Sequence, residues 1–335
     1  MATAAAPWRH RRDPAAMLRR RHLLALPLLP RTAAAQGQAW SPDRPIRFLQ
    51  GFAPGGTTDI LARLLAPELA AALGQRVVVE NCPGAGGTLA AEALARARPD
   101  GATMMLLNNG FAVAAALFRR LPYDPEADID PCALVATAPL VLLAAPRDGI
   151  GTLPDLLAAA RARPGALTVA TVGIGSTQHF ALEALAALAG IGVTHVPYRG
   201  TPAALVALRT GEVQAVMETL GAVLGQVQAG EARALAVTAA ARAPLLPDVP
   251  TMAESGIAGF DLATWYAIGF PAGTPAAVQA RLAEETARAV AAPRLRAQFD
   301  SLGLQPASGG PEATRALIRA EIARALQARA SIPQP

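Results

Sequence analysis

Residues 51–60 read GFAPGGTTDI and follow directly on the apolar run IRFL (46–49). A strand that ends in Pro-Gly-Gly and restarts as a helix at two threonines leaves backbone N–H groups without partners at the helix N-terminus. Because these groups and the helix dipole both favour negative charge, the stretch predicts an anion-binding loop. It leaves open which anion binds and whether the protein changes that anion chemically.

Strand-like apolar runs alternate with helical patterns along most of the chain. We expect strands at 46–52, 76–80, 103–108, 140–145, 167–172, 193–198, 213–218 and 234–238. We expect helices at about 57–73, 88–96, 153–163, 178–189 and 202–210. This order predicts an α/β fold with a mostly parallel sheet covered on both faces. The segment 121–131 is rich in proline and acid and is expected to be a linker.

The end of the chain differs from the rest. A strand and turn at 265–275 lead into two amphipathic helices, at 281–291 and 314–326. We therefore expect two α/β lobes followed by a helical tail that returns to the first lobe. In such folds the ligand lies where the carboxyl ends of the strands open into a crevice.

The net charge of +5 and the pI of about 10.1 come from the first 35 residues. This segment holds seven arginines and a single acid, Asp13, whereas the rest of the chain is close to neutral. The basic charge therefore gives no reason to expect a nucleic-acid partner. Outside this segment the longest apolar stretch, 133–146, is interrupted by Pro139 and is too short to span a bilayer.

The first 35 residues have the order of a secretory signal peptide. A basic region precedes a short apolar stretch from Leu23 to Leu29, and small residues end at Ala35, where we expect cleavage. Arg20 and Arg21 also resemble a twin-arginine signal, so either export route is open. The natural start is Met1 or Met17. We therefore expect an exported protein that resides in the periplasm.

Three glycine-rich loops each follow a strand and precede a helix, at 52–59, 82–88 and 172–179. The chain contains no lysine, which excludes a G-x-x-x-x-G-K-[ST] phosphate loop and a pyridoxal Schiff base. The G-x-G-x-x-G fingerprint ends on Leu89 or Gln178 instead of glycine. A serine nucleophile elbow fails because Ile174 stands two residues before Ser176. No nucleotide-binding motif remains, and no cofactor is expected.

Other catalytic groups are few. Beyond the leader there are two histidines, and Ser176 and His179 at a helix start favour capping and ligand contact over a nucleophile with its base. His195 is expected to be a core or interlobe residue. Asp59 and Glu218 could form a distant carboxylate pair, but Asp59 in a first helical turn first stabilises the dipole. No spacing predicts a metal site. The residues favour binding over catalysis, and a hydrolase is the least favoured alternative.

Cys82 and Cys132 are the two cysteines of the chain. An oxidising compartment permits a disulfide between them, but the sequence does not show that they meet. We favour two unpaired thiols.

The chain resembles the extracytoplasmic solute receptors of tripartite tricarboxylate transporters, the Bug or TctC family, from about Pro45 to Leu326. The resemblance is carried by PIRFLQGFAPGGTTDILARLLAPELAAALGQRVVVEN, PGAGGTLAAEALARARPDGAT, LPYDPEADI, GIGSTQHFALEAL, HVPYRGTPAALVALRTGEVQAV, ALAVTAAARAPLLPDVPTMAESG and WYAIGFPAGTP. It implies a two-lobed periplasmic-binding-protein fold, type II-like, with the ligand cleft between the lobes. We expect a signal peptide over 1–35, a first lobe of 40–146 plus 264–335, and a second lobe of 147–263.

The resemblance also implies which residues bind the ligand. A small carboxylate is held mainly by backbone amides and water from one loop of each lobe, with further contacts after the strands. The implied ligand-binding residues are Phe52, Pro54, Gly55, Gly56, Thr57, Asp59, Asn108, Asn109, Gly173, Gly175, Ser176, Thr177, His179, Tyr198, Arg199 and Glu218.

The implied function is a solute-binding protein that delivers a di- or tricarboxylate, an acidic amino acid or an aromatic acid to membrane permease subunits. A monomer is expected. The alternative is a periplasmic module that signals to a sensor protein. Three departures from the family pattern leave the ligand open: Cys82 where arginine is usual, Met217-Glu218-Thr219 in place of M-F-D-N, and the apolar segment 108–118.

Overall fold

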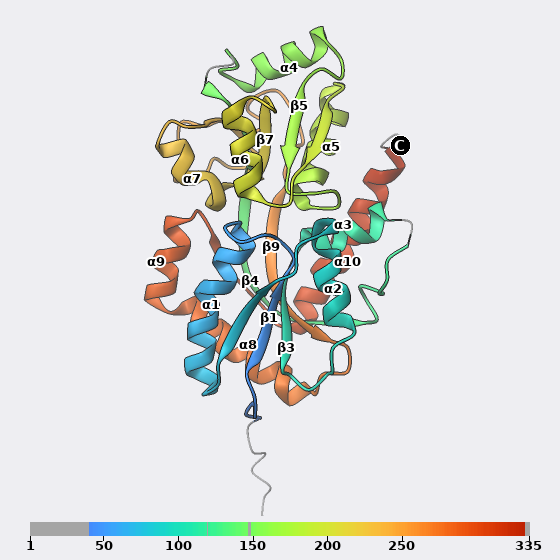
Figure 1. Ribbon diagram of the computed structural model, residues 1–335, viewed down its shortest axis with the longest axis vertical. Helices are drawn as coiled ribbons and strands as arrows, with labels where there is room; N and C mark the ends of the chain where they lie inside the picture. The colour runs from blue at the N-terminus through green and yellow to red at the C-terminus, as the bar shows by residue number, and fades with distance from the viewer. Residues whose placement is uncertain (1–39, 119, 147–148, 332–335) are drawn as a thin grey trace, which may run out of the picture. The chain divides into compact units, whose positions relative to one another are not determined.

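The computed structural model describes residues 40–118, 120–146 and 149–331. The expected signal peptide, its cleavage point near Ala35 and the alternative start at Met17 lie outside these residues. All described residues belong to one compact unit. Within it, Figure 1 shows two groups of strands and helices joined by the strands β4 and β9.

The first group is formed mainly by the N-terminal part of the chain. Its elements are β1 (Ile46–Gln50), α1 (Thr57–Leu73), β2 (Val77–Asn81), the 3-10 turn η1 (Ala85–Gly87), α2 (Thr88–Ala95), β3 (Thr103–Asn108) and α3 (Asn109–Leu117). The long strand β4 (Ile129–Ala144) then leads out of this lobe.

The second group follows. Its elements are α4 (Leu153–Ala162), β5 (Thr168–Thr171), α5 (Thr177–Ala189), β6 (Thr194–Pro197), α6 (Thr201–Thr210), β7 (Ala215–Thr219), α7 (Leu220–Gln228) and β8 (Arg233–Val237). The chain returns along β9 (Ala263–Pro271) into α8 (Ala276–Ala291), α9 (Pro293–Ser301), β10 (Gln305–Gly309) and α10 (Pro311–Ser331).

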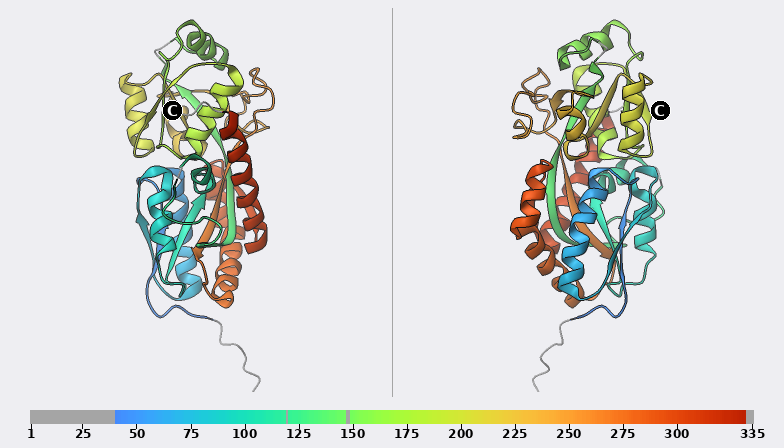
Figure 2. Two further views of the ribbon diagram at one scale, coloured as in Figure 1. Left: turned by 90° about the vertical axis from the view of Figure 1, so that its right-hand side faces the viewer. Right: turned by 60° about the vertical axis from the view of Figure 1, so that its left-hand side comes forward.

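The strands form one continuous ladder in the order β2-β1-β3-β9-β4-β7-β5-β6, with β10 and β8 also paired to β4. Strand β4 pairs with β9 from Ile129 to Pro139 and with β7 from Leu140 to Ala144. It is therefore the element that carries the sheet from one lobe into the other, as the two turned views in Figure 2 also show. The exact residues at which the lobes divide stay a prediction.

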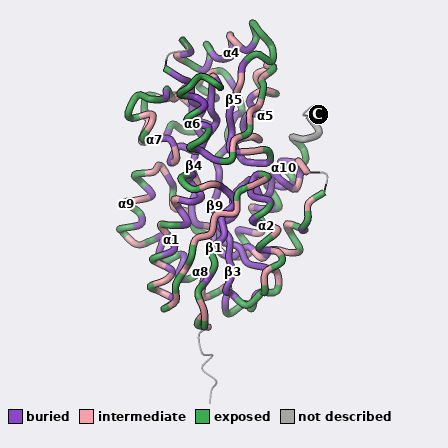
Figure 3. The backbone as a smooth tube through the Cα atoms, in the orientation of Figure 1, coloured by how far each residue is buried: buried purple, intermediate pink, exposed green. Residues whose placement is uncertain are grey.

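Each half of the sheet is buried on both faces, which explains the continuous apolar runs of the strands. In β4, Leu140, Leu142 and Ala144 belong to one core cluster, whereas Val141 and Leu143 belong to another. In β9 the same alternation places Ile268 in one first-lobe cluster and Ala267 in another. Side chains two residues apart share a face, so each lobe has two cores. Figure 3 shows the buried strands inside a layer of partly exposed helices.

The α/β class and the two-lobed fold predicted from the sequence are confirmed, and α1 spans the predicted residues 57–73. The mostly parallel sheet is wrong at its centre, because β9 and β4 run antiparallel to their neighbours. The segment 121–131 was expected as a linker, yet β4 begins inside it at Ile129. The sequence also missed α3, α7, α9 and β10.

The helical tail returns to the first lobe as expected. Helix α8 packs against α1 and β4, and α10 packs along α3 and β4. Both cysteines are free, which confirms the prediction of unpaired thiols. Burial raises the pKa of the Cys132 thiol to about 12. No helix in the described part of the chain is long and apolar enough to cross a membrane.

Candidate functional site

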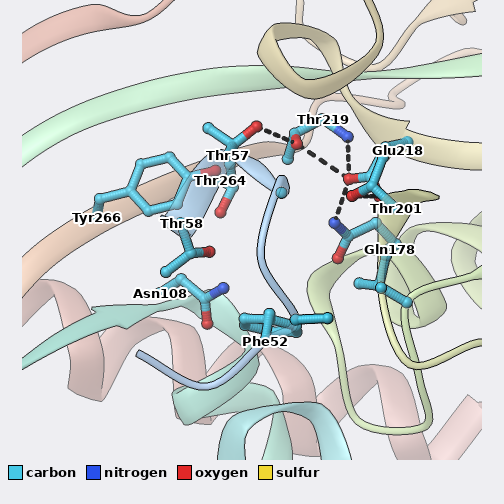
Figure 4. A pocket seen from close by; sticks show the side chains of 14 residues that line it. Phe52, Thr57, Thr58, Asn108, Gln178, Thr201, Glu218, Thr219, Thr264 and Tyr266 are labelled. Carbon is cyan, nitrogen blue, oxygen red and sulfur yellow. Dashed lines mark hydrogen bonds between the residues drawn. The ribbon is translucent and has the colours of Figure 1, made fainter. Parts of the chain in front are cut away.

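A pocket lies where strand ends and helix starts of both lobes meet, and Figure 4 shows its side chains. Its cavity measures about 20 Å³, within a depression of about 340 Å³ that opens to solvent. The lining residues are Phe52, Ala53, Gly56, Thr57, Thr58, Asn108, Val172, Gln178, Gly200, Thr201, Glu218, Thr219, Thr264 and Tyr266. This lining contains no arginine, lysine or histidine. A ligand here must therefore be held by uncharged donors and by helix ends.

Four helices begin at this pocket, and none has a side-chain cap. The N-caps of α1, α3, α6 and α7 are Gly56, Asn108, Gly200 and Thr219, and each lines the pocket without a side-chain hydrogen bond to the helix amides. The first amides of a helix need partners from outside the helix, and they carry partial positive charge. The four uncapped N-termini therefore make the pocket favourable for an anion.

Asp59 lies in the first turn of α1 but turns away from the pocket. Its carboxylate accepts hydrogen bonds from the Gly55 N–H at 3.1 Å, from Arg63 at 3.0 Å and from Asn81 at 2.9 Å. These contacts fix the GFAPGG loop onto the side of the helix. Asp59 therefore braces the loop and leaves the N-terminal amides of α1 on the pocket side uncapped.

Glu218 is a fully buried carboxylate at the end of β7. It accepts hydrogen bonds from Gln178 Nε2 at 2.7 Å, Thr201 Oγ1 at 2.8 Å and the Thr219 N–H at 2.6 Å, and a fourth from Thr219 Oγ1 at 3.0 Å. Burial raises the pKa of Glu218, while these four donors act in the opposite direction. The Thr219 N–H and the Gln178 amide nitrogen can only donate, so Glu218 Oε1 is the acceptor in both contacts.

The side of the pocket opposite Glu218 is formed by the first lobe. Figure 4 shows Tyr266 and Asn108 there, facing Gln178 and Glu218. The Tyr266 side chain on β9 is fully buried, and burial raises the pKa of its phenol. Its hydroxyl has Thr264, Thr57 and Thr219 as hydrogen-bonding neighbours.

A side-chain hydrogen bond joins the two lobes beside the pocket. Thr57 Oγ1 at the start of α1 and Thr219 Oγ1 at the end of β7 lie 2.6 Å apart and share a hydrogen bond. At the rim, a Cβ atom on Gly200 would lie 2.7 Å from the Ala53 Cβ of the other lobe. The two lobes therefore touch each other at two points around the pocket.

Five residues expected to bind the ligand lie in this lining, namely Phe52, Gly56, Thr57, Asn108 and Glu218. The other predicted ligand-binding residues lie outside it: Pro54, Gly55, Asp59, Asn109, Gly173, Gly175, Ser176, Thr177, His179, Tyr198 and Arg199. Contact of this second group with a ligand stays a prediction.

Apart from Gln178, the residues of the second glycine loop, 173–179, do not line the pocket, and the loop backbone packs on the first lobe. Ser176 caps α5 by accepting a bond from the His179 N–H at 3.2 Å, and His179 Nδ1 accepts one from the Gly175 N–H at 3.3 Å. A Cβ atom on Gly86 of the PGAGG loop would lie 2.5 Å from the carbonyl carbon of Gly175. The glycines of these two loops therefore permit close backbone contact between the lobes.

The two residues after β6 also have structural partners or face solvent. The Tyr198 hydroxyl donates to Glu212 at 2.7 Å, and burial together with this carboxylate raises the pKa of Tyr198 to about 12. Arg199 is exposed. Asn109 is buried and bonds to the β9 backbone and to Glu321.

His195 stacks on His179 with ring centroids 4.2 Å apart, and burial together with His179 lowers its pKa to about 4 from 6.5. The unfolded chain binds this proton below about pH 6.5, but the folded chain only below about pH 4. The contribution of His195 to the free energy of unfolding is therefore lost as the pH falls from about 6.5 to 4. We expect the melting temperature of His195→Gln to fall less across this window than that of the unchanged protein. Parallel acid profiles of the two proteins would contradict this assignment.

Nine lining residues were missed from the sequence: Ala53, Thr58, Val172, Gln178, Gly200, Thr201, Thr219, Thr264 and Tyr266. Several of them share a signal, because Gly200, Thr201 and Thr219 stand at a strand end or helix start, where parallel strands open into a crevice. Among the described residues, no group of three or more His, Cys, Asp or Glu is placed to hold a metal ion.

Comparison with known proteins agrees with this architecture. The family described as "Tripartite tricarboxylate transporter family receptor" (TctC) matches residues 61–329. A UPF0065 protein from the tcbD-tcbE intergenic region of Pseudomonas sp. (strain P51) is 37% identical over 91% of this chain and 92% of its own.

Two solved structures are similar over most of the chain. The periplasmic binding protein BugD is 31% identical, with a TM-score of 0.83 over 88% of this chain and 100% of its own. MatC from Rhodopseudomonas palustris, with bound malate, is 34% identical, with a TM-score of 0.83 over 86% of this chain and 99% of its own. The chain belongs to the tripartite tricarboxylate transporter receptor family, TctC.

Proposed function

We propose that this protein is a periplasmic receptor that captures a small carboxylate between its lobes and delivers it to a tripartite tricarboxylate transporter. It acts by binding and not by catalysis, as a monomer and without a cofactor. The observation that carries the proposal is the meeting of four uncapped helix N-termini at one pocket whose lining has no basic side chain.

Helix ends can replace a basic side chain because a carboxylate takes short, charge-assisted hydrogen bonds from backbone N–H groups. The polar side chains that line the pocket are buried, and low exposure to water strengthens such bonds. The cavity of about 20 Å³ has room for about one water molecule. These features favour a small organic acid over a large or polymeric ligand.

Both lobes supply lining residues, so a ligand contacts both only when the lobes are closed. A ligand shifts a conformational equilibrium only by its differential affinity for the two states. Capture by hinge closure follows from this arrangement, with β4 and β9 as the connecting strands. The malate bound to MatC supports the carboxylate class, because that relative shares the fold over nearly its whole length.

Binding is tested by thermal shift and calorimetry with a panel of mono-, di- and tricarboxylates, each paired with its uncharged primary amide. We expect at least one acid to bind and its amide to fail, because only the acid is an anion. At a concentration 100 times its dissociation constant, the acid should add about 2.7 kcal/mol to the free energy of unfolding. A folded protein that binds no acid of the panel would refute the proposal.

Delivery needs a separate experiment. Uptake of the bound acid is measured in cells that carry the transporter membrane subunits, with and without this protein. We expect uptake to require the protein. Binding without any effect on uptake would leave the carboxylate site standing and would contradict the transport role.

A further inference from the structure

We propose that the acid bound by this protein carries a single carboxylate and a hydrogen-bond donor, either a hydroxyl or an ammonium group, which faces Gln178 and Glu218. The inference rests on the proposed function and narrows its ligand class. A pocket of this kind would bind such an acid in preference to a dicarboxylate.

The first observation is Glu218 itself. It supplies a buried carboxyl group at the pocket wall, where it accepts from the backbone N–H of Thr219, the N-cap residue of α7, and from the Thr201 hydroxyl in the first turn of α6. A carboxyl group of the protein therefore already lies against the starts of α6 and α7. Glu218 makes no hydrogen bond to the starts of α1 and α3, so we assign the ligand carboxylate to these two helix ends.

The second observation is that the side-chain oxygen of Gln178 has no hydrogen-bond donor. Gln178 Oε1 is buried and has no hydrogen-bond partner, although Gln178 is only 6% exposed and lines the pocket. The orientation of the amide follows from its neighbour, because Glu218 Oε1 accepts from the nitrogen at 2.7 Å and the oxygen must then point elsewhere. A buried polar atom left unpaired destabilises the pocket, and a donor on the ligand would remove this cost.

The two observations exclude a second carboxylate at this wall. A ligand carboxylate beside Gln178 Oε1 and Glu218 would bring acceptors against acceptors and like charges together in a site without a basic side chain. A hydroxyl or ammonium group instead donates to the free oxygen, and an ammonium group is also attracted by the Glu218 charge.

The test uses four-carbon acids that differ in one group: butyrate, 2- and 4-hydroxybutyrate, 2- and 4-aminobutyrate, and succinate. Affinities are measured by calorimetry at pH 7.5 on the protein without its leader. We expect at least one hydroxy or amino acid to bind tenfold or more tightly than both butyrate and succinate. If only the hydroxy acids bind most tightly, the site takes a hydroxyl donor. If only the amino acids bind most tightly, it takes an ammonium donor. Succinate in first place overturns the inference but supports the proposed function.

Two variants locate the effect. Glu218→Gln removes the charge at nearly constant volume, and we expect it to raise the affinity for succinate relative to butyrate at least tenfold. Gln178→Met removes the acceptor, and we expect it to abolish the advantage of the donor-bearing acid over butyrate. If one variant does not fold, the other decides. Affinity ratios that are unchanged in a folded variant overturn the inference. The proposed function itself is refuted only when the unchanged protein binds neither these acids nor any acid of the wider panel of mono-, di- and tricarboxylates.

Discussion

Gly86→Ala is expected to weaken ligand binding at least tenfold while the protein stays folded. The new Cβ atom would lie 2.5 Å from the carbonyl carbon of Gly175 and 2.8 Å from the carbonyl oxygens of Ile174 and Gly175. These are backbone atoms of the opposite lobe, so no side chain can move aside. The lobes must then stay apart at this rim, and a ligand loses part of its contacts to one of them. Calorimetry with the best acid measures the loss.

Gly74→Ala is the matched control. Gly74 has a φ of +67°, close to the +64° of Gly86, but a Cβ atom there meets nothing within 4 Å. Both variants therefore carry the same cost of a left-handed alanine, about 1–2 kcal/mol, and only Gly86→Ala obstructs closure. We expect Gly74→Ala to lose stability and keep its affinity. Equal affinities in the two variants would show that contact between these loops plays no part in binding.

The two loops illustrate what a glycine pattern can and cannot predict. PGAGG and GIGS each follow a strand and precede a helix, as the anion loops of many α/β proteins do. Here the positions of Gly86 and Gly175 are explained by contact between the lobes, which depends on residues far apart in the sequence. In GFAPGGTTDI, by contrast, an uncapped helix start is a local property, and Gly56 and Thr57 line the pocket. Binding of an anion by this loop stays a prediction.

The sheet shows the same division between local and distant information. Parallel pairs such as β1 with β3 and β5 with β7 follow from the order of strands and helices along the chain. The antiparallel pairing of β4 with β9 joins residues more than 120 positions apart, and their apolar runs read alike in either direction. The sequence therefore predicted the class and most elements, but not the centre of the sheet that connects the lobes.

Glu218 and Gln178 also had different signals in the sequence. Glu218 is an acid near the end of an apolar strand, which is unusual in a core, and the family resemblance implied it as a site residue. Gln178 is the second residue of helix α5, and nothing in the neighbouring sequence distinguishes it from a residue that faces solvent. Its role depends on the 2.7 Å contact with Glu218, which only the packing of α5 against β7 creates.

Asn108 and Asn109 are adjacent, chemically identical and oppositely used, and their alanine variants should separate stability from binding. Asn109 Oδ1 accepts from the Trp265 N–H at 2.6 Å, and its Nδ2 donates to the Ala263 carbonyl and to Glu321, both at 3.2 Å. Asn109→Ala leaves these buried groups unpaired, at about 1–3 kcal/mol for each group. We expect it to lower the free energy of unfolding by about 2–5 kcal/mol, measured by urea denaturation.

Asn108→Ala is the control for this loss, because Asn108 lines the pocket at the start of α3 and its side chain does not cap the helix. We expect the ligand affinity of Asn108→Ala to fall with a loss of stability below about 1 kcal/mol. Asn109→Ala, studied below its unfolding midpoint, should bind the ligand nearly as tightly as the unchanged protein. The opposite pattern, with Asn109→Ala impaired in binding and Asn108→Ala in stability, would mean that α3 faces the ligand through Asn109, its first residue, and not through its N-cap. Such a result would also change our assignment of the ligand carboxylate to the start of α3. The free amides that would bind the carboxylate belong to the same first turn as Asn109.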